Sequence, residues 1–368
     1  MLDSVVILFG GTSNERRVSV ATAQSVAVSL PHDALWFISP TGEVQEVLRD
    51  ELFAHATPFE RDFEPRAGVA LGADLEEAVT SGARQGAVFF LALHGGDGEN
   101  GVVQSILEDH HVPFTGSDAR ASAIAFNKLQ AKDIVRRRGL CTAPSTVLPQ
   151  NDYRDICAKL GDFLERHGRI IVKPVADGSS VNVFKIGAAH EIKVVAEHIT
   201  AASERYFAEE FVKGREVTVG VFDDGTRIRA LPASEVRMEG DRLFDFAGKY
   251  LGRGSVEITP ARISDKVMGE VQRIAVDAHT AIGCDGYSRT DIILSDTDGR
   301  PVYLETNTLP GLTNASFVPQ QLRADNTPFK DFLREQVELA RNRASYDALG
   351  LQARSLRGTL ASHNIPHR

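Results

Sequence analysis

The residues with the clearest chemical potential lie late in the chain, at the ends of two apolar runs. Arg289–Thr290–Asp291 begins one run, and Glu305–Thr306–Asn307 closes the other. Glu305 and Asn307 are two residues apart, so on a strand their side chains point to the same face. Carboxylate and amide oxygens beside a fixed cation suit Mg²⁺ that holds nucleotide phosphates. A solvated strand edge followed by a turn is the alternative.

These residues can share a site only if their two strands pair in a suitable register. Asp298–Gly299 is a turn signal between the strands. A two-residue Asp-Gly loop would pair Asp291 with Thr306 and place Glu305 on the opposite face of the sheet. The metal-site interpretation therefore predicts an odd-length loop, or a β-bulge nearby, that lets Asp291 face the same metals as Glu305.

Composition limits the class of protein. The chain has 368 residues, 42% of them hydrophobic, so it can bury large cores and form two or three domains. Its net charge of −9 argues against nucleic-acid binding, which needs a basic footprint. Three cysteines without metal-ligand spacing and the lack of a signal peptide fit a reduced cytoplasmic protein. No apolar run approaches the roughly 18 residues of a membrane span.

The first strand-to-helix junction predicts an anion-binding site. Ser4–Phe9 is an apolar run typical of a buried parallel strand. Gly10–Gly11–Thr12–Ser13 leads from it into a helical pattern with Glu15 near its start. We expect Ser13 to cap this helix, whose first amides and dipole favour an anion. A dinucleotide-binding loop is disfavoured because the G-x-G-x-x-G spacing is absent.

A second junction is richer in glycine. Ala87–Leu93 predicts a strand, and the loop His94–Gly101 after it holds four glycines, which let backbone approach a ligand closely. The predicted helix Val102–Glu108 follows. An ordinary glycine-rich connection with a surface histidine is the alternative for this loop.

The middle of the chain contains a strand end and turn that suit a phosphate clamp, after a helix with two lysines. Ala121–Val135 predicts one helix that carries Lys128 and Lys132. Ile170–Val172 predicts a strand that ends at Lys173, before a turn rich in glycine and serine. Lysine supplies point charge, hydroxyls and amides supply donors, and glycine supplies hinge freedom. A P-loop is excluded because G-x-x-x-x-G-K-[ST] does not occur.

Acidic residues on the next predicted strands can accept hydrogen bonds from a nucleotide. Ala208–Val212 predicts a strand with Glu209 and Glu210, and the strand Glu216–Phe222 follows a turn at Lys213–Gly214. An acidic pair at a strand edge is usually just solvated, but an adenine amino group and ribose hydroxyls need acceptors of this kind.

In this order the segments resemble the signatures of the D-alanine–D-alanine ligases, a family of the ATP-grasp superfamily, from about Val5 to about Arg343. The matching motifs are Gly10–Glu15 with Val18–Ser19, His94–Gly101, Val172–Pro174 with Gly178–Val181, Arg289–Asp291 and Glu305–Gly311. Each motif alone is moderately specific, whereas five in family order over most of a chain are strongly specific.

The resemblance implies an α/β protein with α+β lobes, a three-domain ATP-grasp fold whose N-terminal domain is a Rossmann-like parallel sheet. The implied limits are residues 1–118 for an N-terminal substrate domain and 119–207 for a central lid lobe. Residues 208–343 would form a C-terminal lobe with the metal site, and 344–368 an extra tail.

The resemblance also implies the reaction. ATP would phosphorylate one D-alanine, and the amine of a second would attack the acylphosphate to give D-alanyl-D-alanine for peptidoglycan. The implied cofactor is a pair of Mg²⁺ ions, which Mn²⁺ can replace, and the implied partners are D-alanine, ATP and a second copy in a homodimer. The alternatives are a ligase joining another pair, such as D-alanine with D-lactate or the amino acids of a natural product, or a silent nucleotide-binding protein.

The resemblance assigns roles in binding ATP and metal, and in stabilising the oxyanion, to several charged or polar residues and to one apolar residue. Lys128 and Lys173 would neutralise phosphates, and Arg289 would stabilise the tetrahedral oxyanion. The remaining ATP and metal ligands would be Glu209, Val212, Glu216, Asp291, Glu305 and Asn307.

Substrate binding and closure are implied for a second set of residues. Glu15 would bind the ammonium of the first substrate with His94 nearby, and Ser316 would contact the carboxylate of the second. Lys249 and Tyr250 would end a mobile loop, and Tyr250 would hydrogen-bond with Ser179 and Glu15 to exclude water.

The chain departs from the family pattern in three places. The mobile loop has Phe244, Phe246 and Ala247–Gly248 where tyrosines and a glutamate are usual, and Asn100 stands where an aspartate is typical. Asn182 replaces a lid glycine, but asparagine tolerates the left-handed backbone region that such a turn needs.

Overall fold

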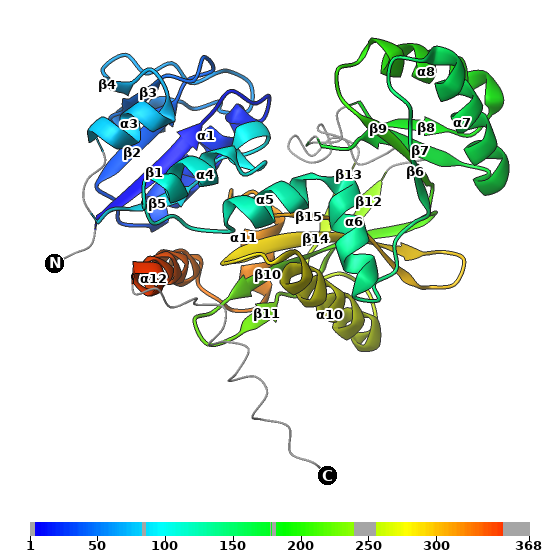
Figure 1. The fold of residues 1–368 in the computed structure, drawn as a ribbon. Helices are drawn as coiled ribbons and strands as arrows, with labels where there is room; N and C mark the ends of the chain where they lie inside the picture. The colour runs from blue at the N-terminus through cyan, green and yellow to red at the C-terminus, as the bar shows by residue number, and fades with distance from the viewer. Residues whose placement is uncertain (1–3, 83–85, 177, 179–181, 239–254, 349–368) are drawn as a thin grey trace.

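The computed structural model describes residues 4–82, 86–176, 178, 182–238 and 255–348, and these form three sheets with flanking helices. In the view of Figure 1 the N-terminal unit and the small central sheet both stand above the C-terminal sheet, at opposite ends of it. The architecture confirms the expected α/β ATP-grasp arrangement.

The N-terminal sheet has the strand order β4-β3-β2-β1-β5. Strand β1 pairs in parallel with β2 and β5, as expected, and β3 and β4 add an antiparallel edge. The strands are β1 (Val5–Gly10), β2 (Ala34–Ile38), β3 (Val44–Glu46), β4 (Val69–Gly72) and β5 (Val88–Leu91). The helices are α1 (Arg16–Ser29), α2 (Arg49–Ala54), α3 (Leu75–Gly82), η1 (Gly96–Gly98) and α4 (Val102–Asp109).

The side chains of β1 point alternately to the two faces of this sheet, and helices cover both faces. Val5, Ile7 and Phe9 pack in a core with α1 and α2, whereas Val6 and Leu8 pack in another with α3 and α4. Side chains of a strand point alternately to either face, so this fully apolar strand needs helices on both sides.

The helix predicted over 121–135 is two helices, α5 (Ala119–Phe126) and α6 (Lys128–Arg137). The single-helix prediction is wrong at Asn127, whose side chain accepts a hydrogen bond from Gln130 N and caps α6. The break also lets Lys128 N donate to Val175 O, at 2.9 Å. Asn127 is a local N-cap signal, but apolar periodicity continues across both helices, and the pairing of Lys128 N with Val175 O fixes the break.

The central unit is an antiparallel sheet of order β6-β9-β7-β8 under two helices. Its elements are β6 (Ser145–Val147), α7 (Tyr153–His167), β7 (Ile170–Pro174), β8 (Phe184–Ile186), η2 (Ala189–Glu191), α8 (Ile192–Ala201) and β9 (Tyr206–Glu210). Apolar residues from α7 and α8 pack on Ile170, Val172 and Ala208 to form its own core. The predicted strands 170–172 and 208–212 are confirmed, although β7 ends later than predicted and β9 begins and ends earlier.

The C-terminal sheet has the order β13-β12-β10-β14-β15, with β11 beside β10. Its strands are β10 (Gly214–Asp223), β11 (Ile228–Ala230), β12 (Ser234–Met238), β13 (Ser255–Ile258), β14 (Tyr287–Ser295) and β15 (Pro301–Asn307). The helices are α10 (Asp265–Ile282), α11 (Phe317–Ala324) and α12 (Phe329–Ala348). Val217, Val219 and Ile292 pack in one core with α5, α6 and α10.

The contacts between helices and sheets support domain limits that we give as a proposal. Helices α5 and α6 contact α10 and β15, so residues 119–137 pack on the C-terminal lobe. Strand β9 lies inside the central sheet, so that unit extends to Glu210. We place the central lobe between residues 144 and 210.

The N-terminal unit and the C-terminal lobe share a core. Phe222, Tyr287 and Phe332 of the C-terminal lobe belong to the same buried cluster as Ile7 and Phe90. On α12, the Arg343 guanidinium donates to Phe114 O and Gly116 O, at 2.7 and 2.9 Å. The end of the family-like region is therefore fixed against the junction after the N-terminal sheet, and residues 349–368 lie outside the described residues.

A buried histidine in this lobe predicts a loss of stability in mild acid. His279 on α10 is fully buried, its Nδ1 lies 2.8 Å from Ser288 Oγ, and burial lowers its pKa from 6.5 to about 4. The unfolded chain binds the proton first, so the free energy of unfolding should fall by about 3 kcal/mol between pH 6.5 and pH 4. Urea unfolding at several pH values measures this.

The variant His279→Gln should flatten the stability profile between pH 6.5 and 4, and the exposed His190→Gln should leave it unchanged. An identical slope in both variants would show that His279 does not cause the acid sensitivity.

Candidate active site

The polar residues of the site come from the face of the C-terminal sheet opposite α10, and from β7, β9 and α6. Ile292 faces α10, so its neighbour Asp291 points to the other face. There Thr218 Oγ1 donates to Asp291 Oδ1, at 2.5 Å. The charges of Glu305 and Glu216 act on Lys173 of β7, so the two sheets present their polar groups to a common region.

The register of β14 and β15 confirms the bulge prediction. Asp291 pairs directly with Glu305 and Arg289 with Asn307, but Ile292 pairs with Tyr303. Leu304 is therefore the extra residue of a β-bulge. The loop over residues 296–299 is closed by the pair Ser295 and Arg300, so the odd-length-loop alternative is wrong.

The bulge gathers four polar side chains on one face of the hairpin. Arg289 donates to both carboxylate oxygens of Asp291, through Nε and Nη2, each at 2.9 Å. Glu305 lies 3.3 Å from Lys128 Nζ, and Asn307 Oδ1 accepts from Leu309 N at 2.9 Å. Two of the predicted metal ligands therefore lie beside a predicted cationic residue, and the third accepts a hydrogen bond from the backbone.

This donor set fits Mg²⁺ that is shared with phosphates. Among the described residues, no group of three or more His, Cys, Asp or Glu gathers to hold a metal alone. Asp291, Glu305 and Asn307 supply hard oxygens from adjacent strand positions. Mg²⁺ bound through one or two carboxylates, with phosphates and water completing the octahedron, needs no more than this.

A buried ion cluster occupies the opposite side of the site. Glu209 on β9 forms ion pairs with Lys132 and with Lys173, the latter at 2.6 Å, and all three side chains are buried. Burial alone would raise the pKa of Glu209, but the charges of the two lysines outweigh it and lower the pKa to about 2. Both lysines also lie within 5.7 Å of the Phe207 ring.

Lys132 is the residue that the sequence analysis noted without assigning a role. It lies one turn after Lys128 on α6, and spacing of four residues places both on one helix face. Burial lowers the pKa of Lys132, with Glu209 opposing the shift. The solvated-edge alternative for Glu209 is wrong, because a carboxylate between two buried lysines is not exposed to water.

Glu257 is a second residue that sequence reasoning missed, because the short run around it carries no recognisable motif. It lies on β13, where its Oε2 accepts from Gln320 Nε2 at 2.9 Å. Burial raises the pKa of Glu257, and the Gln320 hydrogen bond and the charge of Arg289 partly oppose the shift. Gln320 is one turn after Ser316 on α11, so Glu257 lies on the side of the site expected for the second substrate.

Glu15 lies at the junction of the N-terminal unit and the lid. It is buried at the start of α1, and a Cβ added at Gly95 or at Gly178 would approach Glu15 Oε2 to 2.4 or 2.3 Å. Only glycine lets both loops come this close to the carboxylate. The lid and the loop after β5 therefore meet around Glu15.

The predicted N-cap role of Ser13 is wrong. The helix α1 begins at Arg16 and has Glu15 as its N-cap, without a side-chain cap hydrogen bond. Ser13 Oγ instead accepts from Glu15 N at 3.1 Å and donates to His94 O at 2.6 Å. The serine thus joins the two predicted loops, a long-range contact that local helix-start rules do not contain.

His94 and Ser316 are both engaged with protein groups. His94 is buried, with Nε2 2.8 Å from Thr22 Oγ1 and Nδ1 3.8 Å from Glu99 Oε1, so the surface-histidine alternative is wrong. Ser316 occupies the N-cap position of α11 without a side-chain capping hydrogen bond, and its Oγ lies 2.8 Å from Thr313 Oγ1.

Several predicted residues lie outside the described part of the chain. These are Ser179 of the lid and the loop with Phe244, Lys249 and Tyr250. The adjoining lid residue Asn182 has φ +56°, which confirms the expected left-handed conformation. Val212 lies just before β10, and Glu216 lies near the start of that strand.

Comparisons with known proteins agree with this geometry. The family model described as D-ala D-ala ligase N-terminus matches residues 4–117, and the model described as D-ala D-ala ligase C-terminus matches residues 134–338. A D-alanine--D-alanine ligase of Leptospira interrogans serovar Lai is 34% identical, over 93% of this chain and 99% of the relative. One from Methylobacterium radiotolerans is 33% identical, over 92% and 98%.

Solved structures show the same fold. The VanG D-Ala:D-Ser ligase of Enterococcus faecalis superposes with a TM-score of 0.78 and 25% identity, covering 92% of this chain and all of that one. The D-alanine-D-alanine ligase of Coxiella burnetii gives a TM-score of 0.76 at 22% identity, over 97% and 99% of the two chains.

The two polar-faced sheets, with Lys173 and Glu209 on one and the paired carboxylates on the other, define an ATP-grasp enzyme. More narrowly, the chain belongs to the D-alanine–D-alanine ligase family. No helix among the described residues is long and apolar enough to span a membrane.

Proposed function

We propose that this protein joins two D-alanines at the expense of ATP, through a D-alanyl phosphate, to supply D-alanyl-D-alanine for cell-wall synthesis. Membership of the family makes the chain an ATP-dependent ligase. The observation that carries the proposal is the direct pairing of Asp291 with Glu305, beside Arg289 and Lys128. Two carboxylates beside two cations support the proposal, because such a set can hold and transfer a phosphoryl group.

In the first step the carboxylate of one D-alanine attacks the γ-phosphorus of ATP and ADP leaves. Lys128 and Lys173 would neutralise phosphate oxygens, and Glu209, Val212 and Glu216 would contact adenine and ribose. Asp291, Glu305 and Asn307 would hold two Mg²⁺ ions, which when bound offset the negative charge of the phosphates. Glu15 would bind the substrate ammonium, and His94 would position its loop.

In the second step the amine of the other D-alanine attacks the acylphosphate carbonyl. A tetrahedral oxyanion forms, then phosphate leaves with its bonding electron pair and the amine loses a proton. Arg289 would stabilise the oxyanion, since a guanidinium has five N–H donors and Asp291 takes two of them. Ser316 would contact the carboxylate of the attacking D-alanine, and Ser179, Lys249 and Tyr250 would close the site.

Phosphate release with a panel of acceptors tests this function. The protein is incubated with ATP and Mg²⁺ and with D-alanine, L-alanine, D-serine or D-lactate, alone and in pairs, and products are identified by mass spectrometry. D-alanine alone should give one dipeptide for each phosphate. Product that forms only when D-lactate or D-serine is paired with D-alanine would contradict the proposed second substrate.

The metal role of Glu305 gives a separate prediction. We expect Glu305→Gln to raise the Mg²⁺ concentration for half-maximal activity by at least about tenfold, because a neutral amide is a weaker ligand and even outer-shell partners contribute that much. Asp298→Asn on the exposed turn of the same hairpin is the control. Equal Mg²⁺ dependence in the two variants would remove Glu305 from the metal site.

A further inference from the structure

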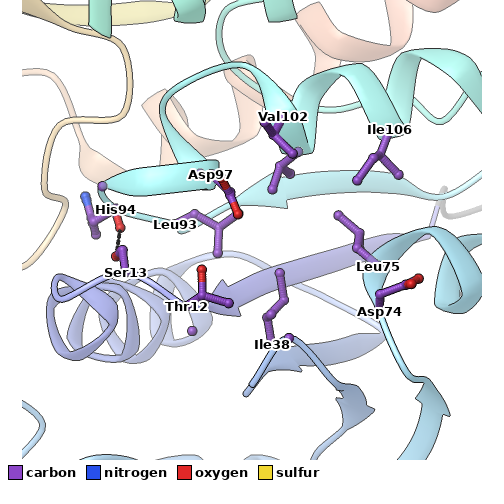
Figure 2. A pocket seen from close by; sticks show the side chains of 16 residues that line it. Thr12, Ser13, Ile38, Asp74, Leu75, Leu93, His94, Asp97, Val102 and Ile106 are labelled. Carbon is purple, nitrogen blue, oxygen red and sulfur yellow. Dashed lines mark hydrogen bonds between the residues drawn. The ribbon is translucent and has the colours of Figure 1, made fainter. Parts of the chain in front are cut away.

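A cavity of about 160 Å³ lies in the N-terminal unit, beside the ends of β1, β2 and β5 (Figure 2). Its interior is apolar and comes from β2, α3, α4 and the loop after β5. The apolar side chains are Ile38, Leu75, Leu93, Val102, Val103 and Ile106. In an open α/β sheet, this crevice beyond the carboxyl ends of parallel strands is where ligands usually bind.

The cavity borders the region around Glu15 but extends to the opposite side of the sheet. Its walls belong to the α3 and α4 side of the sheet, whereas α1, which begins after Glu15, covers the other side. Glu15 is not among the residues that line it. The hydrogen bond from Ser13 Oγ to His94 O forms the wall at one end, as Figure 2 shows.

The charged residues that line the cavity determine whether a cation or an anion is favoured as its ligand. Asp74 and Asp97 line the cavity at exposed positions, Thr12 adds a hydroxyl, and no lysine or arginine is among the lining residues. Within the described part of the chain, neither aspartate forms an ion pair. A carboxylate at each end of an apolar interior favours a cation and disfavours a carboxylate such as that of D-alanine.

We propose that this cavity binds a small organic cation, a primary amine attached to an apolar body of about the size of a benzene ring. A cavity of about 150 Å³ lined by aliphatic residues accommodates benzene, which sets the size of the body. The ammonium group would lie beside Asp97, with Thr12 as a further acceptor, and Asp74 adds negative charge at the other end of the cavity, as Figure 2 shows.

Occupation of the cavity should change the affinity for D-alanine, a consequence that rests on the proposed role of Glu15. Ser13 and Gly95 line the cavity, and both contact Glu15. A ligand that shifts either loop moves the carboxylate that would bind the substrate ammonium. Linkage requires that D-alanine alter the affinity for the amine by the same factor.

Benzylamine is the probe, titrated into the full chain by calorimetry without substrates. We expect a dissociation constant on the order of 1 mM, as suits a ligand of this size. Benzyl alcohol and benzoate should bind about fivefold and more than tenfold more weakly, since each exposed carboxylate contributes modestly. Asp74→Asn with Asp97→Asn should remove the preference for the amine, whereas Asp109→Asn on α4, outside the lining, should keep it.

A blocking variant locates the site. Val102 is 46% exposed and lines the cavity, so Val102→Trp should fill it and abolish benzylamine binding. Val28→Trp, at a 67% exposed position on α1, is the matched control and should bind benzylamine as the parent does. Equal binding by both variants, or binding by neither, would overturn the site.

The outcomes separate this inference from the proposed function. No benzylamine binding in a protein that ligates D-alanine overturns the site alone. A protein that does not ligate D-alanine but binds benzylamine with the expected charge preference supports the site. Once ligation is established, we expect saturating D-alanine to change the benzylamine dissociation constant at least twofold. An unchanged dissociation constant overturns the coupling. Complete displacement of benzylamine by D-alanine would make the cavity the substrate site.

Discussion

Replacing Arg289 with alanine should lower the rate of ligation by about 10²–10³, the usual effect of removing one preorganised oxyanion donor. The reason is that its guanidinium is fixed by Asp291 on the face where the acylphosphate would be attacked. The KM for ATP should stay within about threefold, because the lysines and not Arg289 would bind the phosphates. Steady-state kinetics with D-alanine and ATP as variable substrates measures both.

Arg289 also holds Asp291, so the experiment must separate the two roles. Arg300→Ala, on the exposed turn of the same hairpin, controls for loss of positive charge. If Arg289 acted only by positioning Asp291, the Mg²⁺ concentration for half-maximal activity would rise in Arg289→Ala. We expect that concentration to stay constant while kcat falls, and turnover at the parent rate would remove Arg289 from the mechanism.

Replacing Glu209 with glutamine should reduce the free energy of unfolding by about 3–5 kcal/mol, because it leaves Lys132 and Lys173 buried without their counter-ion. ATP binding should weaken with it, since both lysines lose their fixed positions. Glu210→Gln is the matched control, because Glu210 is the next residue on β9 and is only partly buried. Urea unfolding at neutral pH compares the two variants.

The pH dependence of the free energy of unfolding is a second measurement on the same two variants. The folded-state pKa of Glu209, about 2, lies below its ordinary 4.5, so its stabilisation is present above pH 4.5 and is lost as the pH falls toward 2. Glu209→Gln should lose that acid-dependent part of the stability, and Glu210→Gln should retain it. Parallel acid profiles for the two variants would show that Glu209 is not the titrating group.

The chemistry of the site could be predicted because it is local in sequence. Oxygen ligands two residues apart on a strand, a lysine at a strand end and glycines beside polar loops indicate their roles within a few residues. Asn182 illustrates this, since its tolerance for the left-handed region follows from its own side chain, and the structure gives it φ +56°.

What depended on contacts between distant segments could not be predicted. The break at Asn127 is fixed by the backbone of Val175, Ser13 is drawn to His94, and Lys132 is buried by Glu209. None of these partners is near in sequence, so a local rule assigns Ser13 a capping role and Lys132 no role at all.

By itself, the sequence determined which residue types are available for the proposed phosphate, metal and substrate roles, because residue type and short spacing limit that chemistry. The tertiary structure decided whether they meet. The sequence demanded either an odd-length loop or a bulge, and only strand pairing shows that Leu304 bulges out and sets Asp291 opposite Glu305. Register depends on the packing of both faces of the sheet and on the turn together, and a shift of one residue would send Glu305 to the wrong face.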